Sequence, residues 1–151
     1  VFAGSVRDPS ADAVARVAEL LSRLESSSLW VATNGAEGAP ATLDDEDLRP
    51  MASAFERREL AALSAKRVRA IGVSFRGGRL QGARFDGADL READFSGANL
   101  RGTSFLGADL RHARFDNADL QPLPLVGGAA REVDLTEALY FEPCFANSRR
   151  G

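Results

Sequence analysis

Large apolar residues recur at every fifth position through the middle of the chain. From Phe75 to Leu120 each fifth residue is Phe or Leu, and a smaller residue, most often Ala, stands two positions before it. Neither the helical period of about 3.6 nor the strand period of about 2 keeps a five-residue repeat on one face. The backbone must therefore turn a corner within each repeat, and a chain that always turns the same way becomes a coil.

The repeat also predicts which side chains point inward. The large residue and its small predecessor face the axis of the coil, because two large inward groups on each side would overfill a narrow core. The other three residues of each repeat face outward. Glycine two positions after the large residue, as at Gly82 and Gly107, suits a corner with unusual backbone dihedrals.

The same phase continues beyond the regular stretch in both directions. Backward, it assigns as inward Leu60, Leu63, Ala65, Val68 and Ala70. Forward, it assigns as inward Leu125, Ala130, Leu135, Tyr140 and Phe145. We therefore expect the coil to run to about residue 145, through an irregular turn that contains Pro122 and Pro124.

A helical pattern precedes the repeat. Asp8 is suited to cap a helix that starts at Pro9, and apolar residues then recur on one helical stripe as far as Leu24. We expect this helix to end near Glu25, before a short apolar patch at residues 29–31.

A second helical signal follows a Gly/Pro-rich loop. Thr42 with Asp45 three residues later is a variant of the capping box, and Pro50 should end one short helix and open the next. Helix or turn is therefore expected to about Glu56.

The stretch ADLREADFSGANLRG, residues 88–102, resembles the pentapeptide-repeat family, whose consensus is A(D/N)LXX. The resemblance covers residues 75–120 and implies a β solenoid, a right-handed four-sided β-helix with about 20 residues in each coil. With that geometry Phe75, Phe95 and Phe115 stack on one side and Phe85 and Phe105 on the opposite side. Leucines fill the other two sides.

The chain is expected to divide into four parts. These are a helical N-terminal capping segment (1–58), a transition into the first coil (59–74), the β-helix (75–147) and a tail (148–151). Both ends of such a stack expose unpaired backbone and apolar core, so they need caps. The N-terminal segment is the natural cap for one end, whereas no helix is predicted over the other.

Composition narrows the classes of protein. A net charge of −3 over 151 residues excludes a strongly basic nucleic-acid binder, and no apolar run approaches the roughly 18 residues of a membrane span. Cys144 is the only cysteine, so neither a disulfide nor a Cys/His metal cluster is predicted. No set of nucleophile, base and orienting group can be assembled, so we expect no catalytic, cofactor or metal site, no small-molecule substrate and no enzyme. The cytoplasm is the expected compartment.

Outward residues spaced by one coil should stack in columns. One column holds Arg91, Arg111 and Arg131, with Asp89 and Asp109 beside it, so that opposite charges interleave. This pattern is either a solvated lattice of ion pairs or a docking face for an acidic or phosphate-bearing partner.

A second set of outward residues is apolar. Leu106 and Val126 share a predicted column, and Leu139 and Phe141 flank the inward Tyr140. An exposed patch of this kind usually marks an interface. Either the N-terminal helix or the C-terminal tail covers it, or another chain does.

The sequence therefore favours a non-enzymatic protein-interaction or scaffold module that binds a protein partner or a second copy of itself. The resemblance implies an alternative, because some family members mimic DNA and bind a type II topoisomerase such as gyrase. Residues 75–147 hold 11 acidic and 8 basic residues, which is a weak charge for such a mimic. A third hypothesis is a regulatory or targeting module of a larger protein, since the chain begins at Val1.

Overall fold

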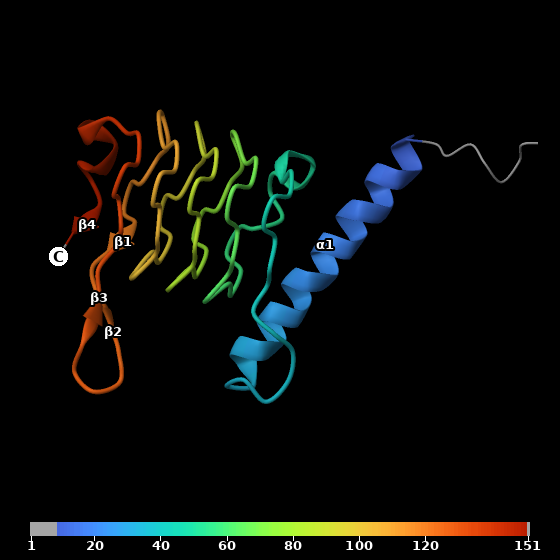
Figure 1. Ribbon diagram of the computed structural model, residues 1–151, viewed down its shortest axis with the longest axis horizontal. Helices are drawn as coiled ribbons and strands as arrows, with labels where there is room; N and C mark the ends of the chain where they lie inside the picture. The colour runs from blue at the N-terminus through green and yellow to red at the C-terminus, as the bar shows by residue number, and fades with distance from the viewer. Residues whose placement is uncertain (1–8, 151) are drawn as a thin grey trace, which may run out of the picture.

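Parallel bridges at every fifth residue join each turn of the chain to the next. The pairs from Glu59 with Arg79 to Asn99 with Asp119 are all 20 residues apart, so four bridges complete one coil. The coils stack side by side along the molecule in the computed structural model, which describes residues 9–150 (Figure 1). A five-residue repeat can form this ladder because each repeat contributes one extended residue and one corner.

Apart from one helix of 24 residues, the regular elements beyond the bridges are short. In chain order they are α1 (Pro9–Ala32), the 3-10 helix η1 (Arg49–Met51), β1 (Asp119–Leu120), β2 (Leu123–Pro124), β3 (Ala130–Arg131), the 3-10 helix η2 (Glu142–Phe145) and β4 (Arg149–Arg150). β1 pairs with β4 in parallel, and β2 pairs with β3 as an antiparallel hairpin.

The inward residues form one continuous apolar core. The ring of Phe75 stacks on that of Phe95 with centroids 4.9 Å apart, and Phe85 stacks on Phe105 at 5.6 Å. These two columns meet edge to face, as between Phe75 and Phe85 at 5.4 Å, which is a favoured arrangement of aromatic rings. The backward extension of the repeat is also confirmed, because Leu60, Leu63, Ala65, Val68 and Ala70 are all buried.

The ladder starts earlier than the sequence predicts. Thr42 pairs with Ser64 and Asp47 with Arg69, both inside the segment 1–58 that was expected to be helical. Between residues 33 and 58 the helical part is η1. The helical prediction does not hold at residues 42–47, because Leu43 is buried and its N–H donates to the carbonyl of Ser64 in the next coil, at 2.7 Å. From residue 49 to residue 57 the chain is 3-10 helix and turn, as expected. The 22-residue spacing of these pairs also hid them from a search at period five.

Helix α1 continues past the predicted end at Glu25 to Ala32. Leu20, Leu24 and Ser27 are buried, and the two leucines belong to the same core cluster as the first coil. This contact keeps the chain helical through three serines that would weaken an isolated helix. The helix ends where Gly35, at φ +88°, donates its N–H to the carbonyl of Trp30.

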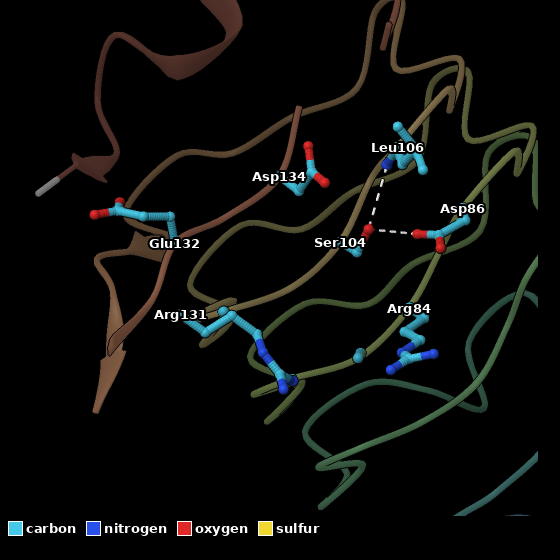
Figure 2. Close-up of a pocket in the computed structure, with 10 residues that line it drawn as sticks. Arg84, Asp86, Ser104, Leu106, Arg131, Glu132 and Asp134 are labelled. Atoms are coloured by element: carbon cyan, nitrogen blue, oxygen red, sulfur yellow. Dashed lines mark hydrogen bonds between the residues drawn. The ribbon is translucent and has the colours of Figure 1, made fainter. Parts of the chain in front are cut away.

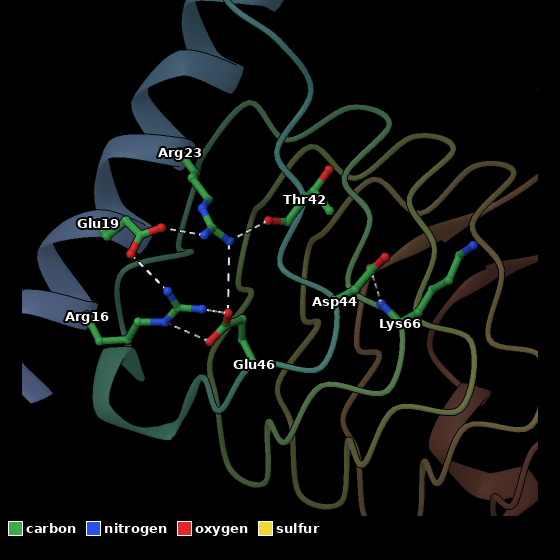
Figure 3. Close-up of polar contacts among 7 residues, drawn as sticks. All are labelled: Arg16, Glu19, Arg23, Thr42, Asp44, Glu46 and Lys66. Carbon is green, nitrogen blue, oxygen red and sulfur yellow. Dashed lines mark hydrogen bonds and ion pairs between the residues drawn. The ribbon is translucent and has the colours of Figure 1, made fainter.

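Polar contacts also hold α1 to the edge of the first coil. Arg16 Nε donates to Glu46 at 3.1 Å, and Arg23 Nη1 donates to the backbone carbonyl of Thr42 at 3.0 Å (Figure 3). Glu19 accepts from both arginines on the helix. Four charged side chains thus link the helix to the coil beside it.

A ten-residue insertion interrupts the last coil. Ser104 pairs with Asp134 and Asp109 with Leu139, 30 residues apart instead of 20. The extra residues form the β2–β3 hairpin, which extends beyond the stack in Figure 1. The expectation that Leu125 and Ala130 point inward was therefore wrong, because both lie in this hairpin and are exposed.

The repeat resumes in phase after the hairpin, because ten residues equal two repeats. Phe145 is buried with its ring centroid 4.7 Å from that of Phe115. Leu135 and Tyr140 are only half-buried, and among residues 9–150 neither N–H donates to a backbone carbonyl. The last coil thus leaves part of its core and backbone uncovered, whereas α1 lies against the first.

Among residues 9–150 there is no helix of the length and apolarity that crossing a bilayer requires.

Candidate interaction surfaces

Aspartate and arginine alternate down one face of the stack. Arg91 donates through Nε and Nη2 to both carboxylate oxygens of Asp89, at 2.9 and 2.8 Å, and Arg111 holds Asp109 in the same way at 2.9 and 2.7 Å. Arg91 Nε also lies 3.8 Å from Asp109 in the next coil. The predicted interleaving of these four charges is therefore present.

The bidentate hydrogen bonds from the two arginines lower the pKa of both aspartates. The side-chain hydrogen bond from Arg111 holds the pKa of Asp109 below its ordinary value, against a smaller opposing effect of burial. The hydrogen bond from Arg91 lowers the pKa of Asp89 in the same way, although burial and, to a smaller extent, the nearby Asp109 oppose it. Two adjacent bidentate pairs of this kind form a surface of alternating charge.

Arg131 does not continue the arginine column as predicted. The hairpin shifts the register by ten residues, so the position above Arg111 belongs to Phe141. The Phe141 ring lies 5.2 Å from that of His112 at a tilt of 52°. Together with Arg91 and Arg111, these two rings line a shallow hollow of about 240 Å³.

Two apolar side chains extend the charged column at the last coil. The backbone of Leu139 pairs with that of Asp109 in a β-bridge, and Phe141 follows two residues later. Leu139 is 53% exposed and Phe141 is 52% exposed. We name the combined surface the Asp–Arg face, and it consists of Asp89, Arg91, Asp109, Arg111, Leu139 and Phe141. Six of the nine residues predicted from the sequence thus come together.

The other three predicted residues lie elsewhere. Leu106 is 39% exposed on a neighbouring face. In the next coil the residue beside this position is Thr136, because the N–H of Gly107 donates to the carbonyl of Thr136. Val126 is fully exposed in the hairpin loop, and Arg131 lies in β3. The predicted column of Leu106 and Val126 does not exist, because the insertion separates them.

A groove that sequence reasoning missed runs between the hairpin and the stack (Figure 2). We name it the hairpin groove; its volume is about 350 Å³ and its lining is Gly82, Ala83, Arg84, Asp86, Gly102, Ser104, Leu106, Arg131, Glu132 and Asp134. No local pattern could have revealed it, since its two walls are far apart in sequence. The run of Pro122, Pro124 and two glycines was the only signal that the chain leaves the coil there.

The five-residue repeat also matches a known family. The family model described as pentapeptide repeats matches residues 71–105 and 88–121, with eight copies. Residues 71–121 of the chain are pentapeptide repeats. The repeats of this family build a β-helix, in agreement with the 20-residue bridge spacing.

Solved structures of other proteins are similar to this chain. One is a pentapeptide-repeat protein of the Arabidopsis thaliana thylakoid lumen, with 26% identity over 61% of this chain and 78% of that one, and a TM-score of 0.40. Another is Rfr23 from the cyanobacterium Cyanothece 51142, with 20% identity over 73% and 80% of the two chains and a TM-score of 0.27. Full-length QnrB1, a plasmid-mediated fluoroquinolone resistance protein, shares 19% identity over 73% and 71%, with a TM-score of 0.26. No curated protein matches.

The acidic side chains of the described residues do not form a metal site. Within residues 9–150 no three His, Cys, Asp or Glu side chains gather where they could hold a metal ion. The acidic run at residues 44–47 is instead engaged in structural contacts. Asp45 pairs with Arg67 at 2.7 Å, Asp47 pairs with Arg49 at 2.7 Å, and Asp44 accepts from the Ser64 hydroxyl.

Proposed function

We propose that this chain is a non-enzymatic interaction module that docks a protein partner, or a second copy of itself, on the Asp–Arg face. The stack acts as a rigid support, a right-handed four-sided solenoid whose first coil is capped by α1. Burial of Leu20 and Leu24 against that coil supports the capping role. The observation that carries the proposal is the pair of exposed apolar side chains, Leu139 and Phe141, at the end of an ordered charged column.

The arrangement has the composition of a protein-binding surface. Interfaces are enriched in aromatic residues and arginine around an apolar centre with a polar rim. Here Phe141 and Leu139 supply the apolar part, and Arg91 and Arg111 supply the rim. Because both guanidiniums are already held by aspartates, a partner would order few side chains on binding, which lowers the entropic cost.

The same contacts weigh against the alternative of a DNA mimic. A mimic must present carboxylates that are available to a DNA-binding surface. In this chain Asp89, Asp109 and Asp119 each accept from an arginine within the stack, the last from Arg101 at 2.8 Å. These three carboxylates are therefore neutralised in place, which favours a mixed-charge docking surface.

The test replaces the apolar end of the face with charge. We expect Leu139→Asp with Phe141→Asp to abolish an association that the unmodified chain shows, because two carboxylates would be buried unpaired in the contact. Light scattering of the purified chain reports self-association. Chemical cross-linking in extract of the source organism, followed by identification of the captured chain, reports a foreign partner.

The matched control is Val126→Asp, which adds the same charge at a fully exposed site in the hairpin. It should leave the association unchanged, and circular dichroism should show that all variants keep the fold. Equal mass and equal cross-linking for the unmodified chain and the double variant would exclude the Asp–Arg face as the docking surface.

A further inference from the structure

The hairpin groove is a packed feature of the fold. Its outer wall is the β2–β3 hairpin, and its floor is the corner that carries Gly82 and Gly102. A Cβ on Gly102 would lie only 2.7 Å from the Cβ of Leu123 and 3.4 Å from Cδ of Arg131, so glycine permits the hairpin to seat there. The hairpin is thereby held against the stack, and the groove has two defined walls.

Arginines reach into the groove from both walls. Arg131 comes from β3, and its Nη1 lies 3.7 Å from the Cβ position of Gly82; Arg84 comes from the coil opposite. Figure 2 shows both guanidinium groups toward the same end of the groove. Within residues 9–150 neither side chain makes a hydrogen bond or an ion pair, in contrast to Arg91 and Arg111.

Neighbouring carboxylates do not neutralise these arginines. Asp86 accepts from the Ser104 hydroxyl, and Asp134 accepts from the N–H of Thr136 at 2.9 Å. The side chain of Thr136, and after it this N–H, lowers the pKa of Asp134. In Figure 2 both aspartates lie at the other end of the groove, and Glu132 points away from it. The groove is thus positive at the Gly82 end and negative at the Asp134 end.

We infer that the hairpin groove binds an extended acidic segment of a protein, with a side-chain carboxylate held between Arg84 and Arg131. Guanidinium groups pair with carboxylates in a bidentate geometry, and two such groups from opposite walls can bind one carboxylate from both sides. Leu106, 39% exposed in the lining, offers an apolar contact to a neighbouring side chain. This site lies off the Asp–Arg face and goes beyond the proposed function.

A peptide titration tests the inference. The probe is acetyl-Gly-Glu-Glu-Leu-Gly-amide at low salt, followed by amide NMR shifts of the full chain. We expect saturable shifts at Gly82, Gly102 and Ser104. Arg84→Ala and Arg131→Ala should each weaken binding about tenfold or more, the size of effect for a charged hydrogen-bonded pair. The peptide with Gln in place of both Glu should not bind.

Controls separate this site from general charge and from the Asp–Arg face. Arg57→Ala removes another exposed arginine, which lies outside the groove and makes no ion pair within the described part of the chain. It should leave binding unchanged, as should Leu139→Asp with Phe141→Asp. Amide spectra of each variant establish that it is folded. Absence of shifts, equal binding of the Gln peptide, equal loss in Arg57→Ala, or acetate alone matching the peptide's affinity would each overturn the inference.

Discussion

The inward residues of this protein pack against inward residues of the neighbouring coils. Phe105 is fully buried, stacks on Phe85, and meets the rings of Phe95 and Phe115 edge to face. Such a side chain touches three coils at once, so its removal leaves a cavity that neither neighbour can fill. The period of five identified these positions from the sequence because the core excludes water on every side.

Phe105→Ala should lower the free energy of unfolding by about 3 to 5 kcal/mol, the usual cost of such a core cavity. Urea unfolding followed by circular dichroism measures it. Phe105→Leu is the control, because it keeps much of the volume and should cost less. A loss near zero for the alanine variant would mean that the ring is not inside the stack.

Single aspartates on the Asp–Arg face also make the free energy of unfolding depend on pH. The pKa of Asp109 is lowered in the folded chain by the hydrogen bond from Arg111. Its contribution to stability is therefore present above the unfolded pKa and is lost as the pH falls through the folded pKa. The relevant window is the acid range below the ordinary pKa of aspartate.

Asp109→Asn should be less stable than the unmodified chain at pH 7, and the difference should vanish as the pH falls below the folded pKa of Asp109. Thermal unfolding between neutral pH and about pH 2 checks this. Glu137→Gln is the control, since that side chain makes no hydrogen bond or ion pair with the residues that the structure describes. A difference that stays constant over the whole pH range would contradict the linkage.

At the scale of elements, the sequence determined the repeat and failed at its interruptions. Inward positions from Leu60 to Leu120 were predictable because one spacing governs them all. The hairpin was not predictable, because an insertion of ten residues keeps the phase of a five-residue pattern. Leu125 fits that phase although it lies exposed in the hairpin loop. The Asp–Arg face was partly predictable for the same reason, whereas the hairpin groove depends on register that no local pattern contains.

The seating of the hairpin can be measured with two glycines. Gly102 and Gly107 have nearly equal φ, +67° and +66°, but a Cβ would meet Leu123 at the first and open space at the second. Gly107→Ala should cost about 1 kcal/mol for the backbone conformation alone. Gly102→Ala should cost about 2 to 4 kcal/mol, because overpacking against the hairpin adds to it. Chemical unfolding of both variants tests this, and equal losses would mean that the hairpin does not press on the corner.

For the whole molecule, the two ends of the stack differ. Helix α1 lies against the first coil with buried leucines and four charged side chains, whereas the last coil has Leu135 and Tyr140 half-exposed. In a stack where each coil contacts only its neighbours, a coil with one neighbour is the least stable. Opening should therefore start at the C-terminal end.

Hydrogen exchange can detect this order. The N–H groups of Asp134 and Leu139, bonded to the carbonyls of Thr103 and Ala108, should exchange at least about tenfold faster than that of Asp94, bonded to Val73. The measurement is made at two protein concentrations, so that protection by self-association is recognised. Uniform protection along the stack at low concentration would contradict the prediction.

Strand pairing at the base of the hairpin lets the length of its loop vary. Leu123 pairs with Arg131 and Pro124 with Ala130, so the loop beyond them is closed at its base before it leaves the stack. Closing a longer loop at a fixed base costs only about 0.6 kcal/mol for each doubling of its length. Residues 125–129 are thus a place where this protein could gain or exchange segments over evolution at little thermodynamic cost, while its bridged coils stay in register.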